Sequence, residues 1–227
     1  MNQQPDKDPI VLSYVGLRRA VGVIGCYLPF ALIFGKLFLQ SRGLENSISS
    51  YYYTTMGDVF VGSMCAIGIF LMSCRGYDRR DAIAGHLACV FAVGVALFPT
   101  APETGATFRT KVIGGVHLSC ATLLFLTLAY FCLKLFTQTS KERPTRRKLQ
   151  RNKVYTACGL IILACIALIA VCKATDILET LKPTLVFESV AILAFGVAWL
   201  TKGEAILKDI EEPQPSSDAG KTIGAHA

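Results

Sequence analysis

Charged residues are scarce in this chain. They make up 17% of its 227 residues, whereas a soluble globular protein usually carries about 25%. Hydrophobic residues make up 52%. An ordinary water-soluble enzyme is therefore not expected, and neither a disordered nor a collagen-like chain fits this composition.

The sequence also lacks the motifs that mark common catalytic and metal-binding sites. It has no Walker A loop, no H-E-x-x-H, no G-x-S-x-G and no C-x-x-C pair. Only three histidines occur, and two of them, His86 and His117, are expected to differ in depth by about 15 Å within a bilayer core of about 30 Å. Because a Zn–N bond is only about 2.0 Å long, these two cannot share a metal. No metal site and no cofactor are expected.

What the sequence does contain is a series of long apolar runs. A helical crossing of a bilayer needs about 20 apolar residues, with a range of about 17 to 25. Six runs meet that length, at about 20–40, 58–74, 82–98, 112–136, 154–172 and 184–201. The sequence therefore predicts an all-α polytopic membrane protein, a bundle of six transmembrane helices over residues 20–204. A cytoplasmic segment is predicted at 1–19 and a disordered cytoplasmic tail at 205–227.

The positions of the basic residues give the predicted orientation. Sixteen of the 23 lysines and arginines lie in the two terminal segments and in the loops after the second and fourth spans, and five lie in the other loops. The remaining two, Lys36 and Lys134, lie near span ends, where they can extend to the interface. Since cytoplasmic loops carry the excess of Lys and Arg, both termini are predicted to be cytoplasmic.

The loop after the fourth span holds most of this charge and predicts a partner. Its basic residues are expected to contact anionic lipid headgroups. They include Arg143, Arg146, Arg147, Lys148 and Arg151. Nucleic acid is not expected, because the loop lacks interleaved aromatic residues and a recognition fold.

Small residues inside the spans predict close helix packing. Gly22 and Gly25 lie in the first span, and the third span carries alanines every four residues from Ala84 to Ala96. All nine cysteines lie within predicted spans and are expected to act as apolar packing residues.

Ionisable residues within spans are the default functional candidates in a membrane protein. Three are predicted in the outer half of the bilayer, Asp58, His117 and Glu188, with Ser119 and Tyr52 nearby. If they converge, two carboxylates beside an imidazole suit a proton relay, general acid–base chemistry or cation binding. The simpler interpretation is that these groups form hydrogen bonds that hold helices together near the interface.

Three kinds of function follow. The favoured one is non-enzymatic: binding or moving a small solute, a proton or a lipid headgroup through an outer-half polar pocket, which predicts a cavity reaching toward the midplane. The first alternative is a membrane-embedded lipid hydrolase or transferase, which predicts that Asp58, His117 and Glu188 meet within hydrogen-bond reach. The second is a structural or accessory subunit with a filled core. A carrier this small usually has to dimerise, so a homo-oligomer is among the expected partners.

Several strings in the chain are also familiar. They include LRRAVGVIG from Leu17 to Gly25, SYYYT from Ser50 to Thr54, ALFPT from Ala96 to Thr100 and WLTKGE from Trp199 to Glu204. Together they resemble an uncharacterised family of bacterial six-span inner-membrane proteins. The Phe-Pro turn followed by a histidine in a span is similar to the Frag/DRAM/Sfk-like membrane families. The resemblance implies the bacterial inner (plasma) membrane and brings no catalytic residues.

Overall fold

The structure is a computed structural model, and it describes residues 9–40, 43–74, 78–102, 104–138, 145–175 and 179–207. In this part of the chain all regular structure is helical. Six long helices follow one another, with a π-helical turn, η2 (Phe131–Leu135), extending the fourth. They are α1 (Pro9–Gln40), α2 (Gly57–Ser73), α3 (Arg79–Leu97), α4 (Phe108–Tyr130), α5 (Arg146–Thr175) and α6 (Pro183–Lys202). Two short 3₁₀ helices, η1 (Ser49–Tyr53) and η3 (Glu179–Leu181), lie in the connections.

The prediction of an all-α bundle is confirmed, and each predicted span is a helix. Five helices are long and apolar enough to cross a membrane, while α2 has only 17 residues. The first helix begins at Pro9. Residues 9–19, which were predicted as part of a cytoplasmic segment, therefore form the beginning of α1. The first eight residues, and the predicted tail from residue 208 onward, lie outside the described residues.

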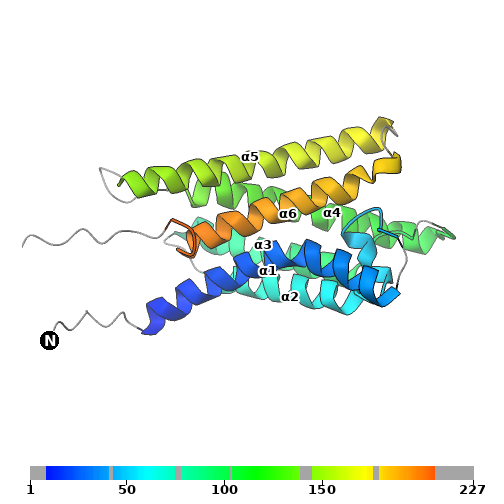
Figure 1. The fold of residues 1–227 in the computed structure, drawn as a ribbon, viewed down its shortest axis with the longest axis horizontal. Helices are drawn as coiled ribbons and strands as arrows, with labels where there is room; N and C mark the ends of the chain where they lie inside the picture. Colours follow the sequence, from blue (N-terminus) through cyan, green and yellow to red (C-terminus); the bar gives the residue numbers. More distant parts are fainter. Residues whose placement is uncertain are drawn as a thin grey trace, which may run out of the picture.

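The long helices run back and forth between two ends of the bundle (Figure 1). At one end Nε of Arg19, in α1, donates a 2.7 Å hydrogen bond to the carbonyl of Gly203, just after α6. At the other end Oε2 of Glu188, in α6, accepts a 2.7 Å hydrogen bond from the amide of Ile48, which follows α1. We call these the basic end and the Glu188 end. The two contacts show that α1 and α6 are antiparallel neighbours.

Local sequence signals account for where three of the helices begin. Asp78 and Asp81 form a reciprocal capping box at the start of α3, and Thr107 and Thr110 form one at the start of α4. Each box satisfies two backbone N–H groups that lack a partner within the helix. Pro183 occupies the first turn of α6, where its missing N–H is tolerated.

Small residues let the helices approach closely, as predicted. A Cβ atom on Gly22 would lie 2.7 Å from the Leu200 backbone nitrogen, and one on Gly196 would lie 2.7 Å from the Cys26 backbone nitrogen. α1 and α6 therefore cross almost backbone to backbone. On α3 the alanine ladder is buried, with Ala88 and Ala92 fully enclosed.

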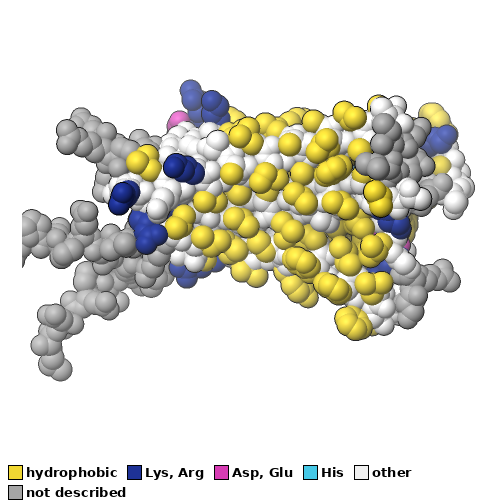
Figure 2. Space-filling view, turned by 45° about the horizontal axis from the view of Figure 1, so that its top comes forward, with side chains coloured by type: hydrophobic (Ala, Val, Ile, Leu, Met, Phe, Trp, Pro, Cys, Tyr) yellow, Lys and Arg dark blue, Asp and Glu magenta, His cyan; other side chains and the backbone are white. Residues whose placement is uncertain are grey.

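The outer surface matches a lipid environment. Hydrophobic side chains cover the middle of the visible face, and Lys and Arg side chains gather toward its two ends (Figure 2). Large apolar side chains such as Phe38 (84% exposed) and Leu160 (56%) point outward. In water an apolar surface of this extent is unusual, so the fold indicates a membrane-spanning helical bundle.

Candidate functional site

An apolar cavity of about 50 Å³ lies among the helices of the bundle. Such a space holds a few water molecules or a short apolar group. Most of its walls are aliphatic and aromatic, among them Leu28, Phe60, Met64, Ile67, Val95, Leu124, Phe125, Leu128, Ile192 and Phe195. Only two lining residues, Ser49 and Glu188, carry polar side chains. The predicted pocket was polar; the cavity that Glu188 borders is predominantly apolar.

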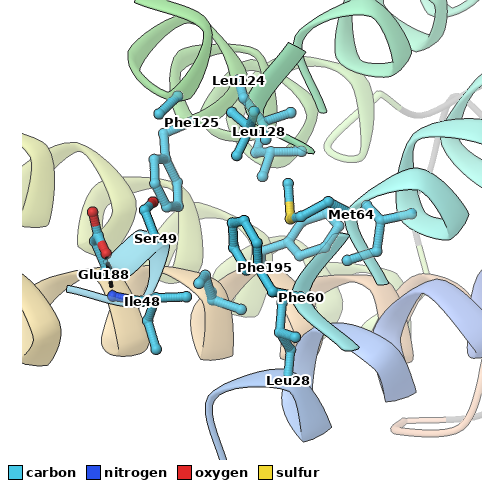
Figure 3. Close-up of a pocket in the computed structure, with 14 residues that line it drawn as sticks. Leu28, Ile48, Ser49, Phe60, Met64, Leu124, Phe125, Leu128, Glu188 and Phe195 are labelled. Atoms are coloured by element: carbon cyan, nitrogen blue, oxygen red, sulfur yellow. Dashed lines mark hydrogen bonds between the residues drawn. The ribbon is translucent and has the colours of Figure 1, made fainter. Parts of the chain in front are cut away.

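The cavity reaches from the Glu188 end toward the middle of the bundle. Its lining on α6 runs from Glu188 to Phe195, which spans about 10 Å at 1.5 Å per residue. Glu188, Ile48 and Ser49 lie on one side, and Phe60 and Met64 lie on the other (Figure 3). The polar group thus stands at one end of an otherwise apolar space.

The carboxylate of Glu188 is held by the backbone of the connection between α1 and α2. Its Oε2 atom accepts a 2.7 Å hydrogen bond from the amide of Ile48, and the backbone of Ser49 is a second hydrogen-bonding group for it. Ile48 precedes η1, which has no side-chain cap of its own. A carboxylate has about four acceptor positions, so Glu188 retains capacity to accept a bond from a ligand.

Residues 43–56, which we call the strap, carry Ile48 and Ser49 to the cavity. Two lysines fasten the beginning of the strap. Nζ of Lys36 donates a 2.6 Å hydrogen bond to the carbonyl of Gly43 and forms an ion pair with Glu45, and Nζ of Lys182 donates to the carbonyl of Leu44. The strap is therefore bound to both α1 and the start of α6.

Lys36 is a residue whose role the sequence did not indicate. We expected its side chain to extend to the interface. It is only 5% exposed, and its ammonium group forms an ion pair with Glu45 of the strap. The ring of Tyr51 lies 6.0 Å from its Nζ atom. Burial raises the pKa of the Tyr51 phenol above its ordinary value, so the hydroxyl stays neutral beside the lysine.

His117 forms a contact between α4 and the end of α3. Its side chain is 4% exposed, and Nδ1 lies 2.6 Å from the carbonyl oxygen of Phe98. Because a carbonyl oxygen only accepts hydrogen bonds, Nδ1 carries the proton in this contact. The histidine does not line the cavity, and its geometry is that of a group joining two helices.

Asp58 lies elsewhere, in the first turn of α2, where it is exposed. It borders a separate open groove of about 470 Å³ together with Tyr52, Thr54 and Thr55. Tyr52 also packs edge to face against Tyr53, with ring centroids 5.2 Å apart. Asp58 and Tyr52, both residues of the predicted site, thus line this groove at the Glu188 end.

The predicted site residues have different partners. Oγ of Ser119 is exposed and donates a 2.9 Å bond to the carbonyl of Gly115 in its own helix. Within the part of the chain that the structure describes, no hydrogen bond or ion pair joins Asp58, His117 and Glu188. Of the three, Glu188 is the one that borders the internal cavity.

The basic residues predicted to contact lipid are divided between surface and interior. Arg143 lies outside the described residues, and Arg146 is exposed on α5. Arg147, Lys148 and Arg151 are half-buried. Nζ of Lys148 donates a 2.8 Å hydrogen bond to the carbonyl of Phe136, which ties α5 to the end of η2.

Possible metal ligands do not cluster in the part of the chain that the structure describes. Over the described ranges, no group of three or more His, Cys, Asp and Glu side chains could hold a metal ion. His86 is exposed, and its Nδ1 lies 2.5 Å from the carbonyl of Ala82 in the same helix.

Comparison with known proteins adds no relative. No family model, no curated protein and no solved structure matches this chain.

Proposed function

We propose that this chain is a non-enzymatic integral membrane protein that binds a small amphipathic molecule in the cavity at Glu188. The apolar part of the ligand occupies the space between α2, α4 and α6, and its hydrogen-bond donor or cationic group meets the Glu188 carboxylate. The observation that carries this proposal is a single carboxylate at the end of an apolar cavity.

The chemistry of the lining supports this class of ligand. Ligand sites are typically apolar with a few placed polar groups that fix orientation. Here Phe60, Phe125 and Phe195 offer contacts to a short alkyl body, and Glu188 offers acceptor positions that Ile48 and Ser49 leave free. An anionic ligand fits this arrangement poorly, because its charge would approach a carboxylate across a medium of low dielectric constant.

The other two functions have less support. An acid–base enzyme requires its groups within hydrogen-bond reach of one another, whereas His117 bonds to Phe98 and Asp58 is exposed in a separate groove. A purely structural subunit requires no polar group beside its core, whereas the Glu188 carboxylate borders the cavity here.

We also propose that all six long helices cross a bacterial inner membrane, with both termini in the cytoplasm. The 17 residues of α2 reach about 26 Å, close to the thickness of a hydrocarbon core. Arg79, Arg146 and Lys202 lie at the ends of their helices at the basic end, and Arg18 lies in α1 next to the Arg19 contact with Gly203, which supports a cytoplasmic location for that end. Reporter fusions at both termini test this; an external signal from either one would contradict it.

Ligand binding can be tested with a matched pair of small probes. Butylammonium and butyrate have alkyl chains of similar length and opposite charge. In purified full-length protein in detergent, butylammonium is expected to raise the Tm in a saturable manner, and butyrate is not. Glu188→Gln should reduce the stabilisation at least fivefold, and Leu124→Trp, which fills the cavity, should abolish it.

Asp58→Asn is the matched control, since it also neutralises a carboxylate at the same end of the bundle. It should leave the response to butylammonium unchanged. Equal stabilisation by the two probes, or equal loss in Asp58→Asn and Glu188→Gln, would contradict the proposed site.

A further inference from the structure

An open groove of about 470 Å³ lies at the Glu188 end, apart from the cavity. We call it the Asp58 groove. Its walls come from the end of the strap, with Tyr52 and Thr55, from the start of α2, with Asp58 and Val61, and from the end of α3, with Leu97. The groove and the cavity share no lining residue among those that the structure describes. Since small-molecule sites typically have about 300–1,000 Å³, the groove has room for a ligand of its own.

Backbone contacts hold the walls of the groove together. The amide of Gly57 donates a 3.0 Å hydrogen bond to the carbonyl of Thr54. A Cβ atom at position 57 would lie 2.5 Å from the carbonyl oxygen of Tyr52, so the strap packs directly against the start of α2. The hydroxyl of Tyr53 donates a 2.7 Å hydrogen bond to the carbonyl of Thr100, just beyond α3. The three segments are therefore joined to one another without a ligand.

Three polar side chains of the lining are available to a ligand. The hydroxyls of Tyr52 and Thr55 and the carboxylate of Asp58 have no hydrogen-bond or ion-pair partner among the described residues. Thr55 and Asp58 are exposed, and Tyr52 is half-buried. The hydroxyl of Thr54, in contrast, is used within the strap, where it donates a 2.8 Å bond to the carbonyl of Tyr51. The groove thus offers one carboxylate, which only accepts, and two hydroxyls, which donate and accept.

The composition of the lining narrows the class of ligand. No basic side chain lines the groove, so an anion would meet only the negative charge of Asp58. A carboxylate in water holds a lone monovalent cation weakly, and Asp58 by itself therefore does not select an amine. A ligand with several hydroxyl groups, in contrast, can use all three polar side chains at once.

We propose that the Asp58 groove binds the polyhydroxyl ring of a hexose. The Asp58 carboxylate accepts hydrogen bonds from sugar hydroxyls, and bonds to a charged acceptor are the stronger ones. The hydroxyls of Tyr52 and Thr55 bond to further sugar oxygens. The ring of Tyr52, which packs edge to face against Tyr53, offers its apolar body to the C–H groups of the sugar. This site is independent of the proposed cavity ligand.

The apolar side of the groove suits a sugar that is attached to a lipid. Val61 and Leu97 line it beside the polar groups, and Leu97, the last residue of α3, is 63% exposed. An alkyl chain attached to the sugar can follow these side chains onto the apolar surface of the bundle. The hexose comes either from a glycolipid headgroup or from a soluble sugar, and the two sources differ in this chain alone.

The test uses purified full-length protein in lauryldimethylamine oxide, a detergent without a sugar headgroup. The probes are octyl glucoside and octyl galactoside, their methyl counterparts, and octyl tetraethylene glycol, which has the same alkyl chain without a sugar. Binding is followed by saturation-transfer NMR. At least one octyl glycoside is expected to bind fivefold more tightly than octyl tetraethylene glycol. Weaker binding of its methyl counterpart identifies a glycolipid as the source, and equal binding a soluble sugar. No preference for either octyl glycoside over octyl tetraethylene glycol overturns the proposal.

Matched variants separate the groove from the rest of the surface. Asp58→Asn should weaken glycoside binding at least fivefold, and Thr55→Trp, which fills the groove from an exposed position, should abolish it. Ser119→Ala removes an exposed hydroxyl outside the groove, and Glu188→Gln removes the carboxylate of the cavity. Both should change the affinity less than twofold. Unchanged binding in Asp58→Asn and Thr55→Trp, or equal losses in the control variants, would overturn the site.

Discussion

Oε2 of Glu188 lies 2.7 Å from the backbone nitrogen of Ile48, a residue 140 positions earlier in the chain. This hydrogen bond joins the start of α6 to the strap and places the carboxylate at the end of an apolar cavity. The same group therefore has two roles: it satisfies a buried amide, and it is the polar end of the proposed ligand site.

The two roles can be separated by substitution. Glu188→Ala leaves the Ile48 amide without its acceptor and should lower the free energy of unfolding by about 1–3 kcal/mol. Glu188→Gln keeps an acceptor oxygen and should cost less than half as much. Unfolding in mixed micelles with increasing SDS measures both. Equal losses in the two variants would show that the hydrogen bond does not hold the strap.

The buried ion pair of Lys36 and Glu45 leads to a second prediction about stability. Lys36→Met leaves Glu45 without its cation in a mostly buried position and should destabilise the protein by about 1–3 kcal/mol. Lys134→Met is the control, since Lys134 is exposed in η2, and should change stability by less than about 0.5 kcal/mol. A double-mutant cycle with Glu45→Gln should give a coupling energy above about 0.5 kcal/mol; additive losses would argue against the pair.

Two glycines, one in the crossing of α1 and α6 and one outside it, should respond in opposite ways to substitution by alanine. A Cβ at Gly196 would lie 2.5 Å from Sγ and 2.7 Å from the backbone nitrogen of Cys26, so Gly196→Ala should cost about 1–3 kcal/mol. Gly62, in α2, has nothing within 4 Å of such an atom, and Gly62→Ala should stabilise the helix by up to about 1 kcal/mol. Tm measurements that show the same sign for both would contradict the packing described.

The sequence predicted the helices well because their signals are local. Apolar runs of bilayer length and the residues that begin α3, α4 and α6 lie within each segment, and the Gly22 and Ala88 positions indicated packing faces. The helices were all found, but α1 and α5 begin at Pro9 and Arg146, well before the predicted spans at 20–40 and 154–172, since a polar segment can continue a helix beyond the membrane.

The site was harder to predict because it depends on pairing between distant segments. Glu188 was identified as an ionisable residue in a span, yet its partner is a backbone amide, which no side-chain pattern reveals. His117 and Asp58 were grouped with it by depth alone, and depth leaves helix rotation open. Lys36 could have been recognised from Glu45, nine residues later, as a charge pair across a turn.

Substitution of His117 is expected to change the stability of the protein without changing ligand binding. His117→Leu removes the donor to the Phe98 carbonyl and should lower the free energy of unfolding by about 1–3 kcal/mol. His117→Asn places an amide N–H near the position of Nδ1 and should recover at least half of that loss. Neither variant should alter stabilisation by butylammonium by more than twofold. A selective loss of that response in His117→Leu would give the histidine a role in the ligand site.

The most direct test of the proposed cavity is an NMR titration of protein labelled with ¹³C in its four methionine methyl groups. Met64 lines the cavity and is 7% exposed, whereas Met72, in the same helix, is 38% exposed and lies outside the lining. Butylammonium should shift the Met64 resonance in a saturable manner and leave Met72 in place, and Glu188→Gln should weaken the response. An unchanged Met64 resonance, or equal shifts at Met64 and Met72, would contradict ligand binding in this cavity.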